Sequence, residues 1–275
     1  MLASSLLVLA ITASAPNVHP LKFHLVGDSV ATGVGAAAWL SSEYVFKKQL
    51  APPNCRWCDR NGLEDTLNPI DRWGRGIAAR PESLKGWDTA STVVGFVVLP
   101  LTLFGTDAWL AHRDDALDGV PVDILLSVEA LMGALTLNQA VKFVAGRERP
   151  FVHRRSLGEV GDSAAFANPT DDNLSFFSGH STFSFALLAA TATIADLRGY
   201  RGSKWVWIVG LPIATAVPLM RMAADKHYLT DVATGAVIGT LVGIGVPRLF
   251  HGRADSGIDV TLVPAPGGIA VDARF

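Results

Sequence analysis

The stretch that decides the fold is the run TASTVVGFVVLPLTLFGTDAWL, from Thr89 to Leu110. It is apolar over roughly the 20 residues that an α-helix needs to cross the hydrocarbon core of a bilayer. Comparable runs follow at Val120–Val144, Ser181–Ala195, Trp205–Met220 and Val232–Phe250, and a weaker one, rich in Gly and Ala, precedes it at Val30–Phe46. The pattern predicts an all-α fold, a helical bundle of about five or six mostly membrane-spanning helices. A soluble all-helical core would also produce apolar runs, and it stays as the alternative.

The composition favours the membrane interpretation. Of the 275 residues, 49% are hydrophobic and only 17% are charged, against roughly 25% charged in an average soluble protein. Mean hydropathy is +0.32. The formal net charge of −2 gives no strongly basic surface of the kind that binds nucleic acid, so no nucleic-acid partner is expected.

Four regions are expected along the chain. Residues 1–15 resemble a signal peptide that ends in Ala-Ser-Ala, although no Lys or Arg precedes its apolar run. Residues 16–88 form an N-terminal helix and a polar loop region. If the signal peptide is cleaved, this helix lies outside the membrane; if it is not cleaved, the helix becomes a first span. Residues 89–250 form the helical bundle. The tail, residues 251–275, alternates apolar and polar residues around a Pro-Gly turn and predicts a short β-hairpin.

The charges on the connections indicate their sides. Leu197–Lys204 is short and carries three basic residues, which is typical of a cytoplasmic loop. Counting helices then places Gly146–Ser178, Arg221–Thr230 and the polar region Lys47–Asp88 together on the outer side, and Ala111–Gly119 inside. Long loops on a rigid scaffold commonly carry function.

The two cysteines, Cys55 and Cys58, lie in the outer polar region. A second Cys pair or a His pair with zinc-ligand spacing does not accompany them. A local disulfide suits a periplasmic or extracellular loop, and free thiols remain the alternative.

Three polar clusters lie at predicted helix ends, all on the side of the long connections. They are Lys142-x6-Arg149-Pro150, Phe177-Ser178-Gly179-His180 and Arg221-x5-His227-x3-Asp231. Transfer of a phosphoryl group requires fixed positive charge around the phosphate oxygens. Lys142, Arg149 and Arg221 supply three cations, and the Arg side chains can each engage two oxygens.

The second cluster immediately precedes an apolar run. Backbone N–H groups at a helix N-terminus bind anions, so Ser178 and Gly179 are candidates for phosphate binding. Gly179 also lets the backbone approach the ligand closely.

A nucleophile and an acid are available in the remaining residues. His227 and Asp231 are four residues apart and share one face of a helix. A carboxylate that accepts from one ring nitrogen leaves the other nitrogen free to attack phosphorus. His180 can then protonate the leaving oxygen. No step of this scheme needs a metal or another cofactor.

The three clusters resemble the signature of the phosphatidic acid phosphatase type 2 superfamily, K-x6-R-P, P-S-G-H and S-R-x5-H-x3-D. That group includes lipid phosphate phosphatases, bacterial non-specific acid phosphatases and vanadium haloperoxidases. The resemblance implies the same roles for the catalytic and phosphate-binding residues as the chemistry above. Phe177 stands where the family usually has Pro, and Met220 where it usually has Ser, which leaves substrate preference open.

The expected function is therefore metal-independent hydrolysis of a phosphate monoester or pyrophosphate of a membrane lipid through a phosphohistidine. Phosphatidic acid, phosphatidylglycerol phosphate, a polyprenyl pyrophosphate and a phosphorylated lipid A are the candidate substrates. We expect a bacterial-type inner membrane location with the active site on the periplasmic or extracellular face. The alternatives are a vanadium-dependent haloperoxidase, a soluble periplasmic acid phosphatase, and a membrane scaffold without turnover. The oligomeric state is left open.

Overall fold

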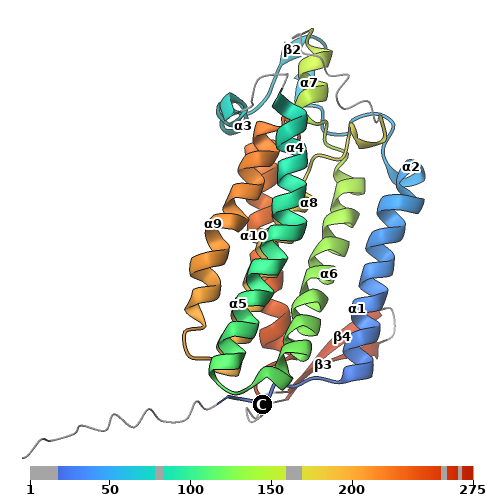
Figure 1. The fold of residues 1–275 in the computed structure, drawn as a ribbon. Helices are drawn as coiled ribbons and strands as arrows, with labels where there is room; N and C mark the ends of the chain where they lie inside the picture. The colour runs from blue at the N-terminus through green and yellow to red at the C-terminus, as the bar shows by residue number, and fades with distance from the viewer. Residues whose placement is uncertain (1–17, 78–82, 159–168, 255–258, 266–267, 275) are drawn as a thin grey trace, which may run out of the picture.

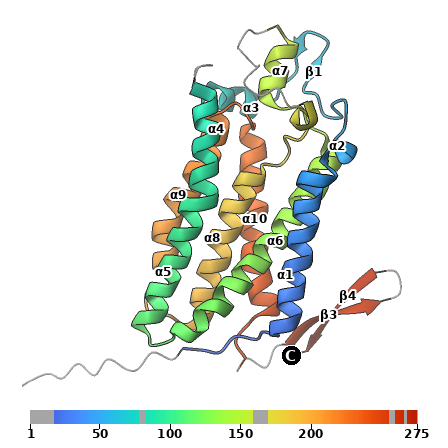
Figure 2. The same ribbon diagram turned by 45° about the vertical axis from the view of Figure 1, so that its right-hand side comes forward.

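The computed structural model describes residues 18–77, 83–158, 169–254, 259–265 and 268–274. Within these ranges, six long helical segments stand side by side as one bundle (Figures 1 and 2). They are α1 (Leu25–Leu40), the continuous run of α4 (Leu84–Val93), the π-helical turn η4 (Val94–Val98) and α5 (Leu99–Arg113), then α6 (Val120–Ala145), α8 (Gly179–Arg198), α9 (Lys204–Ala223) and α10 (Leu229–Phe250). The predicted all-α bundle is confirmed. The predicted signal peptide, residues 1–15, lies outside the described residues.

Four segments of the described chain are long and apolar enough to cross a membrane. They are Leu84–Arg113, Leu117–Ala145, Lys204–Ala223 and Leu229–Phe250. Large apolar side chains on their outer surfaces are exposed, as with Leu101 at 70% and Leu241 at 62%. Extended apolar surfaces of this kind mark contact with a membrane or a partner. Together, length, composition and outward apolar surface identify a membrane protein.

Helix α8 lies in the middle of the bundle, where α6, α9 and α10 pack around it. Small residues on α10 let its backbone approach α8 closely. A Cβ atom added to Gly239 would lie 2.6 Å from the Thr182 carbonyl oxygen, and one added to Gly243 would lie 2.5 Å from that of Ala186. The same close approach brings the start of α8 against the start of α10, where the Ser178 N–H donates to the Asp231 carbonyl at 3.1 Å.

A Gly239→Ala protein is expected to be less stable, because its methyl group would force α8 and α10 apart. Overpacking of this kind costs about 1–3 kcal/mol. Gly245 is the matched control on the same helix, since a Cβ there would have no neighbour within 4 Å and Ala favours helix formation. Thermal unfolding in detergent should show a lower Tm for Gly239→Ala and an unchanged or higher Tm for Gly245→Ala. Equal Tm values would show that the close approach is not required.

One end of the bundle carries the long connections, as predicted from the sequence. Their short elements are η1 (Ser41–Val45), α2 (Lys47–Leu50), β1 (Arg60–Asn61), β2 (Glu64–Asp65), α3 (Pro69–Gly74), η2 (Arg75–Ile77), α7 (Pro150–Ser156) and η7 (Pro169–Asp171), gathered at the upper end in Figure 1. Cys55 and Cys58 form a disulfide there. The β1 and β2 strands pair antiparallel in a two-stranded hairpin.

The opposite end carries the short turns. The 3₁₀ turn η5 (Leu117–Gly119) precedes α6, and Arg201 in the α8–α9 turn pairs with Asp114 in the α5–α6 turn at 2.6 Å. This contact confirms that the two predicted inner loops share one end. The tail forms the predicted hairpin, in which β3 (Asp259–Ala265) pairs antiparallel with β4 (Gly268–Arg274).

Two of the bundle helices begin five residues earlier than the apolar runs. The α4 helix begins at Leu84 rather than Thr89, and α1 begins at Leu25 rather than Val30. The first turns of α4 carry Lys85 and Asp88, which the sequence suggested were loop residues. Asp88 is a helix residue, and its carboxylate pairs with Arg221 on α9.

Candidate active site

A pocket of about 280 Å³ opens at the end of the bundle that carries the long connections. Six of the predicted site residues line it: Lys142, Arg149, Gly179, His180, Arg221 and His227. The other two, Ser178 and Asp231, are fully buried. The three sequence clusters therefore meet at one place, although residues 142 and 231 lie far apart in the chain.

The first cluster reaches the pocket from the end of α6. Gly146, with φ of 56°, ends this helix in the left-handed conformation, which favours glycine. Arg149 then stands just before α7 and is only 6% exposed. Its Nε donates to the Asp171 carbonyl at 2.8 Å, and its Nη1 donates to the Lys226 carbonyl at 3.1 Å. Two backbone oxygens thus fix the guanidinium at the pocket wall.

The second cluster forms the start of α8. Ser178 is the N-cap of this helix, and its side chain accepts from the Ser181 N–H. Asn138 on α6 donates from Nδ2 to the Phe177 carbonyl at 2.7 Å and so ties the preceding loop to the bundle. A Cβ at Gly179 would lie 3.2 Å from Lys142 Nζ. Glycine therefore lets the Lys142 ammonium sit beside the free N–H groups of the helix start, which together favour an anion.

His180, the next residue of this cluster, faces α4. Its Nε2 lies 3.4 Å from the Thr92 hydroxyl, and its ring centre lies 4.8 Å from that of Phe96. The hydroxyl and the aromatic ring fix the orientation of the imidazole at the pocket, where it can exchange a proton with a bound group.

The third cluster joins the end of α9 to the start of α10. Arg221 is 4% exposed; it forms a short ion pair with Asp88 and donates to the Ser91 hydroxyl at 3.1 Å. The turn that follows contains Asp225 with φ of 56°, and it delivers His227 to the pocket beside Arg149.

His227 is 3% exposed, and its two ring nitrogens face different surroundings. Nε2 lies 3.4 Å from Arg149 Nη1, and Nδ1 lies 3.6 Å from Asp231 Oδ2, which is longer than a hydrogen bond. Burial, followed by the charges of Arg149, Arg221 and Lys142, lowers the pKa of His227 well below its ordinary value of 6.5. The imidazole is therefore neutral at pH 7 and has a lone pair with which to attack.

Asp231 is held by three donors. Its Oδ2 accepts from the Ser175 hydroxyl at 2.5 Å and from the Tyr228 N–H at 2.9 Å, and its Oδ1 accepts from Arg147 Nη1 at 2.7 Å. The contact with Tyr228 belongs to a capping box at the start of α10. These three contacts fix the position of the carboxylate behind His227.

Sequence reasoning missed several residues that the structure brings to this site. Asp88, Lys226 and Asn138 line the pocket, and Arg147 supports it from behind. No motif singles them out, because their partners come from remote parts of the chain. One hint of Arg147 was available in the sequence, because it is a basic residue that lies between Lys142 and Arg149.

Asp171, in the connection between α7 and α8, is another residue that sequence reasoning did not assign to the site. It lines the pocket, and its side chain is only 27% exposed and pairs with Lys47 at 2.6 Å. Burial alone would raise the pKa of Asp171, but the charges of Arg149 and Lys47 outweigh it and lower the pKa to about 2. Asp171 and Asp88 thus neutralise cations that a bound phosphate would otherwise engage.

Comparisons with known proteins find similar sequences. Residues 123–255 match the family model of the PAP2 superfamily. The lipid A 1-phosphatase of Porphyromonas gingivalis is 32% identical over 114 residues, which cover 42% of this chain and 20% of that protein. The chain thus spans about a fifth of the length of this curated relative.

Among solved structures, the crystal structure of a transmembrane PAP2 type phosphatidylglycerolphosphate phosphatase from Bacillus subtilis aligns with a TM-score of 0.45 at 18% identity. The alignment covers 80% of this chain and 93% of that one. The segment matched by the family model contains all three clusters, from Lys142 to Asp231. Through residues 123–255, the chain is similar to the PAP2 (phosphatidic acid phosphatase type 2) superfamily.

Proposed function

We propose that this protein hydrolyses a phosphate ester or pyrophosphate of a membrane lipid through a phosphohistidine at His227. The observation that carries the proposal is the convergence of a neutral, buried His227 with the cations Lys142, Arg149 and Arg221 around one small pocket. The cations match the charge on a phosphoryl group, and the positive surroundings stabilise the charge that shifts during its transfer.

In the first step, the lone pair on His227 Nε2 attacks phosphorus as the bond from phosphorus to the ester oxygen breaks. Burial and the charge of Arg221 lower the pKa of His180 well below 6.5, and the negative charge of a bound phosphate opposes both effects. The substrate thus favours the protonated form of His180, which transfers its proton to that departing oxygen.

Arg149, whose Nη1 lies 3.4 Å from His227 Nε2, holds a phosphate oxygen next to the attacking nitrogen. Gly179, which lines the pocket, presents its backbone N–H group to the same phosphate. Ser178, whose own N–H donates to the Asp231 carbonyl, caps the helix that offers this group.

In the second step, a water molecule attacks the phosphohistidine. Neutral His180 takes a proton from this water as the phosphorus–nitrogen bond breaks, which releases inorganic phosphate and regenerates both histidines. Asp231 acts through His227: its negative charge, 3.6 Å from Nδ1, stabilises the positive charge that the ring carries while it is phosphorylated.

A lipid substrate suits the walls of the pocket. Apolar and aromatic side chains from α1, η1, η4 and α6 line its side: Trp39, Tyr44, Phe96 and Leu135. An acyl or prenyl chain can remain among the apolar faces of the spans while its phosphate reaches the cations. The lipid A 1-phosphatase relative makes phosphorylated lipid A a candidate beside phosphatidic acid, phosphatidylglycerol phosphate and polyprenyl pyrophosphate.

The active site is proposed to face the periplasm or the cell exterior. The Cys55–Cys58 disulfide lies at the same end of the bundle as the pocket, since the N–H of Arg56, between the two cysteines, donates to the Gly146 carbonyl at the end of α6. Disulfides persist in oxidising compartments. Arg198, Arg201 and Lys204 lie at or near the opposite end, in agreement with the positive-inside rule.

Phosphate release from a panel of lipid phosphates tests the function. Purified protein in detergent with EDTA should release phosphate from at least one of the four candidates, whereas a matched His227→Asn preparation sets the background. The panel also ranks monoesters against diphosphates. Halide oxidation by hydrogen peroxide after vanadate loading, without release from any phosphate ester, would contradict the proposal and favour a haloperoxidase.

The proposal predicts an alkaline limb in the pH profile. Burial, reinforced by the charge of Arg149 and opposed by Asp88, lowers the pKa of Lys226 to about 8. Below that pH Lys226 is a cation and attracts the phosphate; above it the charge is lost. We expect kcat/KM, which reports the free enzyme, to fall about 5- to 10-fold between pH 7 and pH 9. Lys226→Arg should remove this limb because Arg stays charged.

The exposed Lys48 provides the control. A Lys48→Arg protein should keep the wild-type profile. The same alkaline limb in the Lys226→Arg protein would assign the limb to another group.

A further inference from the structure

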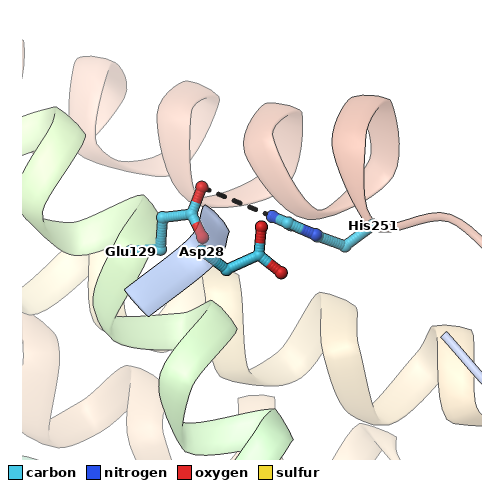
Figure 3. Close-up of side chains that lie close together, drawn as sticks. All are labelled: Asp28, Glu129 and His251. Atoms are coloured by element: carbon cyan, nitrogen blue, oxygen red, sulfur yellow. Dashed lines mark ion pairs between the residues drawn. The ribbon is translucent and has the colours of Figure 1, made fainter. Parts of the chain in front are cut away.

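A second group of ionisable side chains lies at the other end of the bundle from the active site. Asp28 on α1, Glu129 on α6 and His251 just after α10 come together there (Figure 3), and each offers a ligand atom within 4.8 Å of the others. They line a cavity of about 920 Å³ whose apolar wall includes Val34 and Phe250. Glu129 lies within a candidate span, where an ionisable residue marks a functional site until shown otherwise.

The histidine in this group is oriented in the way that a metal ligand requires. His251 is 3% exposed, and its Nδ1 lies 3.2 Å from the Lys22 carbonyl oxygen. A carbonyl can only accept, so Nδ1 carries the proton in this contact and the lone pair of the neutral ring is on Nε2. Histidines that bind metals are commonly fixed by this second contact.

Two buried atoms of the group have no hydrogen-bond partner among the described residues, His251 Nε2 and Glu129 Oε2. The Nε2 atom faces Glu129 Oε1 at 3.5 Å, which exceeds the length of about 2.7–2.9 Å of a charge-assisted hydrogen bond. Buried polar atoms without partners are rare and call for an explanation such as a bound ion. Asp28 Oδ2 accepts from the His24 N–H at 2.7 Å, and this contact holds the carboxylate at the start of α1.

We propose that Asp28, Glu129 and His251 bind one divalent transition-metal cation of the Zn²⁺ class. One imidazole and two carboxylates suit such an ion better than Mg²⁺ or Ca²⁺, which prefer oxygen ligands alone. Two carboxylates and a neutral imidazole also balance the charge of the ion.

Metal–ligand bonds of about 2.0–2.2 Å place tetrahedral ligands about 3.4 Å apart. Ligand atoms that now lie within 4.8 Å of one another would therefore move closer by at most about 1.4 Å on binding. The ion would join α1, α6 and the end of α10. This site lies apart from the proposed active site, and the metal proposal does not depend on the proposed hydrolysis.

Zinc binding to the full-length protein in detergent tests the site. After EDTA treatment and removal of the chelator, titration with Zn²⁺ should give one bound ion per chain by elemental analysis. The Tm should rise by at least about 3 °C, because a ligand that binds only the folded state stabilises it. Mg²⁺ at the same concentration should give a smaller shift.

Variants locate the ion. Glu129→Gln, which keeps the shape of the side chain, and His251→Ala should each lose the bound zinc and the Tm shift. His112→Ala, at an exposed histidine, and His227→Asn, at the distant pocket, should keep both. If His251→Ala does not fold, Asp28→Asn together with Glu129→Gln gives the same test. Absence of bound zinc in the wild type, or binding that persists in Glu129→Gln, would overturn the proposal and leave a simple ion pair between His251 and Glu129.

Discussion

A His227→Asn protein is expected to lose phosphate release by at least about 10⁴-fold, the scale seen when a nucleophile is removed from an enzyme. Asparagine is similar in size but has no lone pair on nitrogen with which to attack phosphorus. The surrounding cations, Arg149 and Arg221, remain in place, so substrate binding should persist and the loss should fall on kcat. Initial rates over a range of lipid phosphate concentrations separate the two constants.

The phosphohistidine itself can be trapped. His180→Asn removes the acid and later base, so a substrate with a good leaving group should phosphorylate His227 faster than water clears it. Acid-labile, alkali-stable label from ³²P-substrate is expected in His180→Asn and not in the His180→Asn, His227→Asn double variant. His112→Asn, at an exposed histidine, controls for the substitution. Label at another residue, or wild-type release by His227→Asn, would exclude the proposed nucleophile.

The helices could be predicted because apolar runs of spanning length have few alternative structures in a membrane. The runs at Val120–Val144 and Val232–Phe250 became α6 and α10 with ends shifted by three residues or fewer. The boundary at α4 was wrong by five residues. Polar residues at the end of a helix appear as loop residues in a sequence when their partner is remote, and for Asp88 that partner is Arg221.

The site residues could be proposed because the catalytic chemistry fixes their types and local spacing. His227 and Asp231 are neighbours within a few residues, so the sequence displays them together. Asp171 and Arg147 owe their positions to contacts across the fold, with Lys47 and Asp71 respectively. Contacts between residues that are remote in the sequence leave no local pattern from which they could be predicted. The same holds for Asp28, Glu129 and His251, which only the packing of three helices brings together.

Replacement of Arg147 by Met is expected to have the second largest effect. The Arg147 side chain is 0% exposed and pairs with Asp71 at 2.7 Å, Asp231 at 2.7 Å and Asp59 at 2.8 Å. Trp57 and Tyr228 contact its guanidinium, with ring centres at 4.1 and 4.2 Å. Removal of one partner from a buried ion pair costs about 3–5 kcal/mol, because the remaining charge has no compensation. Here Asp71 and Asp231, both buried, would lose their counter-charge.

The expected result for Arg147→Met is a Tm lowered by at least about 6 °C in detergent and a kcat that falls with little change in KM, since Asp231 would no longer be fixed behind His227. Arg147 is thus a positioning residue. Arg147→Lys keeps the charge but cannot bridge Asp71 and Asp231 with a planar fork, so it should recover part of the stability and little of the kcat.

Arg72→Met is the matched control for Arg147→Met. The Arg72 side chain is 57% exposed and lies 3.7 Å from Asp65, and exposed pairs contribute about 0–1 kcal/mol. Its Tm and kcat should therefore stay near those of the wild type. If Arg147→Met and Arg72→Met showed the same small change, the buried network would not hold Asp231 in place. The role of Asp231 behind His227 would then have to rest on Ser175 and the Tyr228 N–H, the other two donors to its carboxylate.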